Sequence, residues 1–227
     1  MNPRTADPFP IYDAEIRRLR RHLRALGPSG YRAPSHCRGW SVKDVVAHLC
    51  DDEIYNQACL DETFADLDFS GGLDASNQRG VRRRRAMTPA AVRLEWERRQ
   101  RRVRRAWGRI GLEGKIDTAG AGRYPLRLQV WHLAQEYAIH ADDIEVPVAA
   151  RARAGRAAWR IAFGLFAARE DGSPIDARLR PDGSVLLRRR GRRVPLEAET
   201  FIAYLTRRPQ QLKDPAQRRM VERLLGQ

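Results

Sequence analysis

The sequence predicts a mainly helical protein that ends in a small α+β region. Apolar residues recur at three- and four-residue steps in four long segments of the N-terminal two-thirds, a pattern typical of amphipathic helices. Toward the C-terminus the pattern changes to short runs separated by turn residues. The 227 residues are 42% hydrophobic and 31% charged, which excludes a disordered chain. We expect two parts, residues 1–150 and residues 151–227.

The first two predicted helices span residues 11–26 and residues 41–66. The first has leucines and isoleucines at helical steps and is ended by a Gly-Pro pair. Ser41 and Asp44 at the start of the second resemble a capping box, in which each side chain bonds the backbone N–H of the other residue. The intervening residues 28–39 are rich in Pro, Ser and Gly and are predicted to form a loop.

A third helix is predicted from Thr88 to about Ile110. Pro89 stands at its first helical position, where a missing backbone N–H costs little. Its apolar residues form one stripe, and arginines cover much of the remaining surface. Glycines on either side of this helix predict loops at residues 67–80 and 111–124.

A fourth helix is predicted at residues 125–143 and a fifth at residues 154–170. The C-terminal part then changes character. Strands are predicted at residues 175–180, 185–190 and 193–196, and further helices at residues 199–206 and from residue 215.

The chain is strongly basic, with a net charge of +15 from 43 basic and 28 acidic residues. Such a charge makes nucleic acid the first partner to consider. Only three of the basic residues are lysines, however, and lysine is a routine phosphate contact. We therefore favour arginines that solvate ordinary helix faces, and regard nucleic acid as an unlikely but not excluded partner.

The cysteines and the hydropathy indicate a cytoplasmic protein. Cys37, Cys50 and Cys59 are odd in number and have no CxxC spacing, which suggests a reducing compartment. No stretch of 18 apolar residues is present, so we expect no membrane partner. The expected assembly is a monomer or a homodimer.

The fourth predicted helix carries the candidate chemistry. Glu136 and His140 are four residues apart and face the same way, so one rigid helix could supply two ligands to a divalent ion. At about 100° per residue, these two lie closer to the apolar stripe than His132, which fits a place at the rim. A Glu and a His at this spacing also occur as ordinary surface pairs, so spacing alone leaves both interpretations open.

Two short segments resemble a known family. Residues 39–49 (GWSVKDVVAHL) and residues 136–144 (EYAIHADDI) are similar to the two motifs of the mycothiol-dependent maleylpyruvate isomerase family, part of the DinB/YfiT-like superfamily. The resemblance implies an up-down four-helix bundle. It also implies a divalent metal, most often Zn²⁺, held by His48, Glu136 and His140.

The resemblance implies a function as well. The chain would be a metal-dependent enzyme that uses a low-molecular-weight thiol, mycothiol or a similar one, as the nucleophile. The reaction would be S-transfer or isomerisation of a small electrophile, which the basic surface suggests is anionic. Residues 155–227 look like a reduced form of the family's C-terminal domain, which argues against maleylpyruvate itself as the substrate. The alternative is a basic binding module for nucleic acid or an acidic partner, with a structural or vestigial metal site.

Overall fold

The computed structural model describes residues 1–119 and 121–226, and the chain divides into two compact units. One unit is Asp7–Val146, and the other joins Met1–Ala6 to the chain from Pro147 onward. The chain passes from one unit to the other between Val146 and Pro147, whereas the predicted boundary follows residue 150. None of the described helices is long and apolar enough to cross a membrane.

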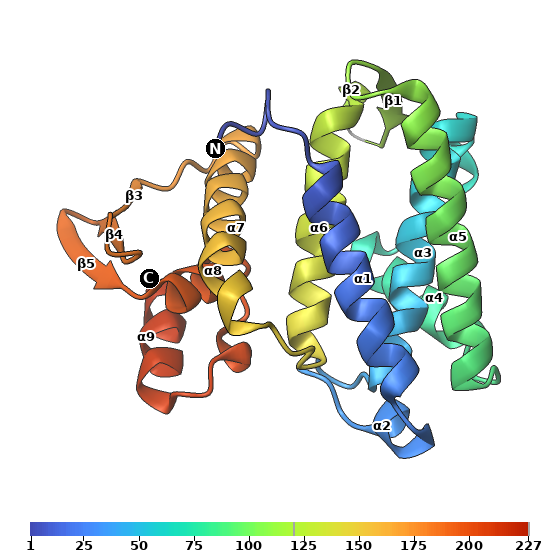
Figure 1. The fold of residues 1–227 in the computed structure, drawn as a ribbon, viewed down its shortest axis with the longest axis horizontal. Coiled ribbons are helices and arrows are strands. Elements are labelled where there is room, and N and C mark those ends of the chain that lie inside the picture. Colours follow the sequence, from blue (N-terminus) through green and yellow to red (C-terminus); the bar gives the residue numbers. More distant parts are fainter. Residues whose placement is uncertain (120, 227) are drawn as a thin grey trace. The chain divides into compact units, whose positions relative to one another are not determined.

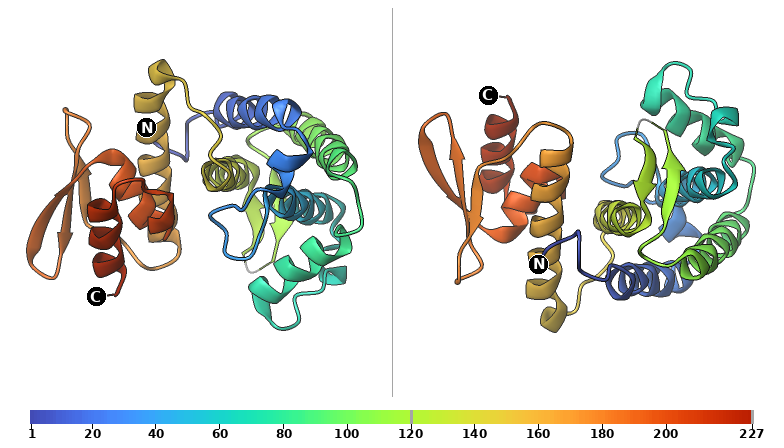
Figure 2. Two further views of the ribbon diagram at one scale, coloured as in Figure 1. Left: turned by 90° about the horizontal axis from the view of Figure 1, so that it is seen from below. Right: turned by 90° about the horizontal axis from the view of Figure 1, so that it is seen from above.

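The first unit is built on four long helices, as the sequence predicts. They are α1 (Phe9–Ala25), α3 (Val42–Asp61), α5 (Pro89–Ile110) and α6 (Leu126–Asp143). Figure 1 shows them side by side, and Figure 2 views them from below and from above. Helix α3 packs closely on α5, and α1 packs on α6.

Local sequence signals fix where these helices begin, and their apolar stripes form the core. Ser41 and Asp44 make the predicted capping box at the start of α3. The Thr88 side chain accepts a hydrogen bond from a backbone N–H in the first turn of α5. The largest side chains of the bundle core, which include Trp96 and Trp107, are fully buried. Burial of such aromatic surface is the main favourable term in folding.

Three segments predicted as loops contain regular structure, so those predictions are wrong in part. The short helix α2 (Pro28–Arg32) lies before α3. Helix α4 (Gly72–Arg83) follows the 3-10 turn η1 (Phe64–Asp66), and the antiparallel hairpin of β1 (Lys115–Thr118) and β2 (Gly122–Pro125) precedes α6. The glycines that suggested loops serve turns instead: Gly71 precedes α4 with φ of +73°, and Gly122 begins β2 with φ of +60°. Helix α3 also ends at Asp61 rather than Asp66, because Glu62 adopts the left-handed conformation.

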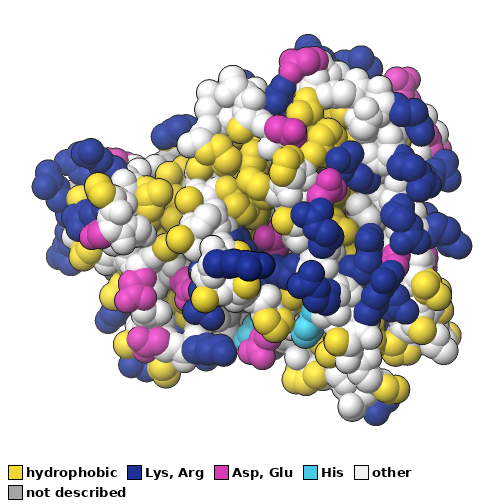
Figure 3. All heavy atoms as spheres, viewed as in Figure 1, with side chains coloured by type: hydrophobic (Ala, Val, Ile, Leu, Met, Phe, Trp, Pro, Cys, Tyr) yellow, Lys and Arg dark blue, Asp and Glu magenta, His cyan; other side chains and the backbone are white. Residues whose placement is uncertain are grey.

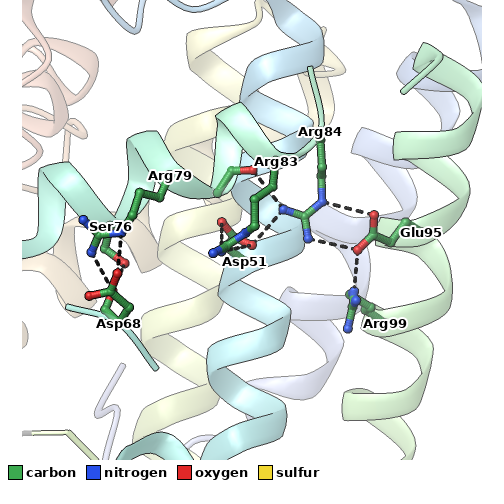
Figure 4. A network of polar contacts seen from close by, with 9 residues as sticks. Asp51, Asp68, Ser76, Arg79, Arg83, Arg84, Glu95 and Arg99 are labelled. Carbon is green, nitrogen blue, oxygen red and sulfur yellow. Dashed lines mark hydrogen bonds and ion pairs between the residues drawn. The ribbon is translucent and has the colours of Figure 1, made fainter. Parts of the chain in front are cut away.

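Arg84, directly after α4, binds this helix to the bundle through buried charges (Figure 4). Its guanidinium donates to Asp51 of α3 at 2.8 Å and to both carboxylate oxygens of Glu95 in α5 at 2.9 and 3.1 Å. Gly80 allows the close approach, since a Cβ there would lie 1.2 Å from the Asp51 carboxylate. Gly80 makes the sequence of α4 look like a loop, but the same glycine lets α4 pack closely on α3.

A buried acid, Glu53 of α3, joins the helices at the centre of the bundle. It accepts hydrogen bonds from the hydroxyls of Tyr137 and Tyr12, and Trp96 in turn donates to Tyr137. Burial raises the pKa of Glu53 to about 8, so the carboxyl is neutral near pH 7.

Arginines crowd the surface of α1 and α5, as the dark blue side chains of Figure 3 show. Several of them converge on Glu97 of α5, which Arg24, Arg93 and Arg101 approach to between 2.8 and 3.3 Å. Burial acts to raise the pKa of Glu97, but these guanidinium groups outweigh it and lower the pKa to about 2. Part of the basic surface is thus neutralised within the fold, which agrees with arginines in an ordinary structural role.

The second unit combines helices with the predicted three-stranded meander. It contains α7 (Ala150–Glu170), β3 (Ala177–Leu179), β4 (Val185–Arg189), β5 (Arg192–Leu196), α8 (Ala198–Leu205), η2 (Pro209–Gln211) and α9 (Pro215–Gly226). The strands are antiparallel in the order β3-β4-β5. Their apolar side chains, such as Val185 and Leu187, pack with Phe201 of α8 and Val221 of α9 in one core.

We expect the substitution Gly80→Ala to destabilise the first unit by roughly 1–2 kcal/mol, even though alanine favours helix. The new Cβ displaces the Asp51 carboxylate from Arg84 and breaks a charge-assisted hydrogen bond. Chemical denaturation followed by tryptophan fluorescence measures the change. Gly108→Ala is the matched control, because Gly108 is an exposed helical glycine whose Cβ would meet only Arg104, at 3.4 Å. That control should be stabilised by up to about 1 kcal/mol; equal effects of the two variants would contradict the close contact.

The raised pKa of Glu53 predicts a pH-dependent stability. Between its ordinary value of 4.5 and about 8, the folded protein keeps a proton that the unfolded chain loses, so this group makes stability fall as pH rises. Glu53→Gln removes that loss and keeps an acceptor for Tyr137. The stability of the variant relative to the parent should therefore grow by about 1.4 kcal/mol per pH unit from pH 5 to pH 7. Urea denaturation at several pH values tests this. Glu62→Gln is the control, because the Glu62 side chain is 67% exposed. If the difference in stability between Glu53→Gln and the parent did not change with pH, the prediction would be refuted.

Candidate metal centre

His48 from α3 meets Glu136 and His140 from α6 at one point of the bundle. The carboxylate oxygen Oε1 of Glu136 lies 3.4 Å from Nε2 of His48 and 3.0 Å from Nε2 of His140. One nitrogen or oxygen from each of the three lies within 4.8 Å of the others. The three residues that the resemblance singled out are therefore neighbours in space.

The three side chains differ in their access to solvent. The His48 and His140 side chains are only 5% and 4% exposed, whereas the Glu136 side chain is 38% exposed. The cluster is thus closed on the histidine side and open on the carboxylate side. His132, one turn before Glu136, is half-buried outside the cluster and contacts the Tyr124 hydroxyl at 3.2 Å.

The electrostatics of the cluster favour a charged Glu136. Burial acts to raise its pKa, but the nearby imidazoles of His140 and His48 outweigh burial and lower the pKa of Glu136 well below its ordinary value. Burial likewise acts to lower the pKa of His140, but the Glu136 charge and the hydrogen bond to Asp143 raise that pKa well above its ordinary value. An anionic carboxylate thus lies between two imidazoles.

His140 has a second set of partners that sequence reasoning did not identify. Its Nδ1 lies 3.0 Å from Oδ2 of Asp143, and the same oxygen accepts from the Cys37 thiol at 3.1 Å. The loop before α3 carries Cys37 to this place, because the backbone N–H of His36 donates to the Asp143 carbonyl at 2.8 Å. Loop residues follow no helical period, so no sequence pattern relates Cys37 to α6.

His48 is held by packing on one side and by the Glu136 carboxylate on the other. The Trp40 ring lies 5.3 Å from the His48 ring, centre to centre, and Nδ1 of His48 is buried without a hydrogen-bond partner among the described residues. Asp52, one turn further along α3, lies 3.6 Å from Nε2. Burial raises the pKa of Asp52 to about 6, although the nearby His48 acts to lower it.

Comparison with known proteins decides the family. The model of the mycothiol maleylpyruvate isomerase N-terminal domain matches residues 12–145. This chain belongs to that family. A crystal structure of the mycothiol-dependent maleylpyruvate isomerase is similar in fold, with a TM-score of 0.66 and 13% sequence identity, over 90% of this chain and 91% of that one. A mutant of the same enzyme is similar over the same shares, with a TM-score of 0.64 and 13% identity. No curated protein matches the chain in sequence.

The isomerase fold extends beyond the bundle. Since 91% of the solved isomerase chain is matched, the expectation of a reduced C-terminal region is wrong. The elements after residue 170 are short, and for this reason the sequence suggested a small appendage. Together, however, they form a compact part with its own core. Membership of the isomerase family supports the prediction that the chain is an enzyme, of the isomerase type.

The residues of the cluster are suited to a divalent ion. Two imidazoles and one carboxylate are a donor set that zinc accepts in catalytic sites. Zinc ligands at tetrahedral angles lie roughly 3.3–3.6 Å from one another. The distances of 3.4 and 3.0 Å from Oε1 of Glu136 to the two histidine nitrogens are close to this range. His48, Glu136 and His140 could therefore hold such an ion with small adjustments.

Proposed function

We propose that this chain is a metal-dependent enzyme that uses a low-molecular-weight thiol, mycothiol or a close analogue, as the nucleophile in the isomerisation of a small electrophile or in S-transfer, in which the electrophile becomes attached to the thiol sulfur. The observation that carries the proposal is the convergence of His48, Glu136 and His140 on one point. Membership of the mycothiol maleylpyruvate isomerase family supports the thiol. The similarity to the solved isomerase over most of both chains makes a substrate like maleylpyruvate a reasonable candidate.

His48, Glu136 and His140 would hold the ion, with zinc the first candidate. An ion bound there would favour the thiolate form of a coordinated thiol near neutral pH. With three protein ligands, a position stays open for the thiol, as in catalytic rather than structural zinc sites.

The surroundings of the ligands fit such a role. Trp40 and the bundle core exclude water from the two histidines, while the partly exposed Glu136 leaves a route from solvent. The net charge of +15 would attract an anionic substrate or thiol. We place the enzyme in the cytoplasm, as a monomer or homodimer, in line with its free cysteines.

The metal site predicts binding of one divalent ion per chain. Protein purified without a histidine tag and stripped with chelator should take up zinc in a calorimetric titration and should melt at a higher temperature when loaded. His140→Ala should weaken zinc binding by roughly 100-fold or more, because it removes one of three ligands. His132→Ala is the matched control on the same helix and should bind as the parent does. If the parent takes up no divalent ion, the proposal fails.

The proposed reaction predicts activity that needs both the metal and the thiol. We expect the zinc-loaded protein to isomerise a cis-unsaturated keto diacid such as maleylpyruvate, followed by absorbance, in the presence of mycothiol and not in its absence. His48→Ala should reduce the rate by at least about 100-fold, since it removes a ligand. His132→Ala again serves as the control.

A second outcome would support the alternative of a basic binding module. Salt-dependent binding of DNA, measured by fluorescence anisotropy and unchanged in His48→Ala, would indicate that the arginine surface carries the function.

Turnover without added thiol would contradict the proposed mechanism in a different way, because the thiol is the proposed nucleophile.

A further inference from the structure

The two nitrogens of His140 face two different groups of ligand atoms. Nε2 faces Glu136, 3.0 Å away, in the cluster with His48. Nδ1 faces Oδ2 of Asp143 at 3.0 Å and the Cys37 sulfur at 3.8 Å, and these three residues also bring their ligand atoms within 4.8 Å of one another. Both groups could hold a metal, but they use opposite sides of one imidazole.

We propose that Asp143 is a positioning residue and not a ligand: its carboxylate accepts the Nδ1 proton of His140 and keeps Nε2 free to bind the metal beside His48. The Cys37 thiol donates a second hydrogen bond to the same oxygen and holds Asp143 in place. This inference rests on the proposed metal site at His48, Glu136 and His140.

Solvent access distinguishes the two sides of the ring. The Asp143 side chain is completely buried, whereas the Glu136 side chain is 38% exposed. A metal that must accept a thiol needs a position open to solvent, which the Nε2 side offers. A fully buried carboxylate, in contrast, needs hydrogen-bond donors, and the imidazole Nδ1–H and the thiol supply two.

The backbone fixes the same arrangement. The N–H of His36 donates to the Asp143 carbonyl at 2.8 Å, which ties the loop before α3 to the last turn of α6. Within that loop, the hydroxyl of Ser35 accepts from the Cys37 N–H at 3.2 Å and donates to the Trp40 carbonyl at 2.9 Å. The loop that places Cys37 against Asp143 therefore also leads to Trp40, which packs on His48.

Asp143→Asn tests the positioning role. An asparagine can donate its amide N–H to Nδ1, which would move the imidazole proton to Nε2 and block the metal. We expect zinc binding, measured by competition with a chromophoric chelator, to weaken by roughly 10- to 100-fold. Asp142→Asn is the matched control, because the Asp142 side chain is 20% exposed and lies 3.9 Å from Arg18; it should bind zinc as the parent does.

Cobalt(II) distinguishes positioning from ligation. In protein loaded with cobalt and free of added thiol, we expect no sulfur-to-metal charge-transfer absorption, and Cys37→Ser should leave the visible spectrum unchanged. A charge-transfer band that Cys37→Ser removes would overturn the proposal, because Cys37 would then be a ligand on the Nδ1 side.

A spectrum of the parent protein covers the case in which Asp143→Asn does not fold. Long-range ¹H–¹⁵N correlation on the zinc-loaded parent, assigned with His140→Gln, should show His140 protonated at Nδ1. Metal at Nδ1 would overturn the positioning role and leave the enzyme proposal standing, as would unchanged zinc affinity in a folded Asp143→Asn protein. A parent that binds no zinc would overturn both proposals.

Discussion

Polar side chains connect α3 and α6 at several levels of the bundle, and the candidate site depends on these contacts. His48 meets Glu136 at one level of the bundle, and Asn56 accepts a hydrogen bond from Gln129 at another. Polar groups at a buried helix interface destabilise the fold unless each finds a partner. The close helix packing lies elsewhere, between α3 and α5 and between α1 and α6.

The two histidines at this interface are oriented by different forces. His140 has a carboxylate at each nitrogen, Glu136 at Nε2 and Asp143 at Nδ1, so its ring is fixed from both sides. His48 meets Glu136 at Nε2 and packs on Trp40, but its Nδ1 has no hydrogen-bond partner among the described residues. The loop before α3 supplies both the Trp40 contact and the Cys37 contact, so this one loop borders both histidines of the cluster. A mutation that moves this loop would therefore change the surroundings of both imidazoles.

Helical periodicity predicted the four helices of the bundle and the relative burial of His140 and His132, because both depend on the direction of side chains along one helix. It placed α4 in a loop, because the reason for Gly80 is the Asp51 carboxylate on another helix. Nor could it find Cys37, whose place depends on a backbone hydrogen bond from His36 to Asp143. The short motifs around His48 and Glu136 were enough to indicate the family. That the two residues meet in space, however, depends on how α3 and α6 are arranged.

The interface between α3 and α6 keeps two glutamates in opposite charge states. Glu53 is surrounded by tyrosine hydroxyls and apolar side chains, so burial favours its neutral form. Glu136 has two imidazoles beside its carboxylate, so its anionic form prevails despite burial. If Glu53 were also charged, the two carboxylates would repel each other through an interior of low dielectric constant. The neutral Glu53 thus adds no charge at the centre of the bundle, while Glu136 places a negative charge between the two imidazoles.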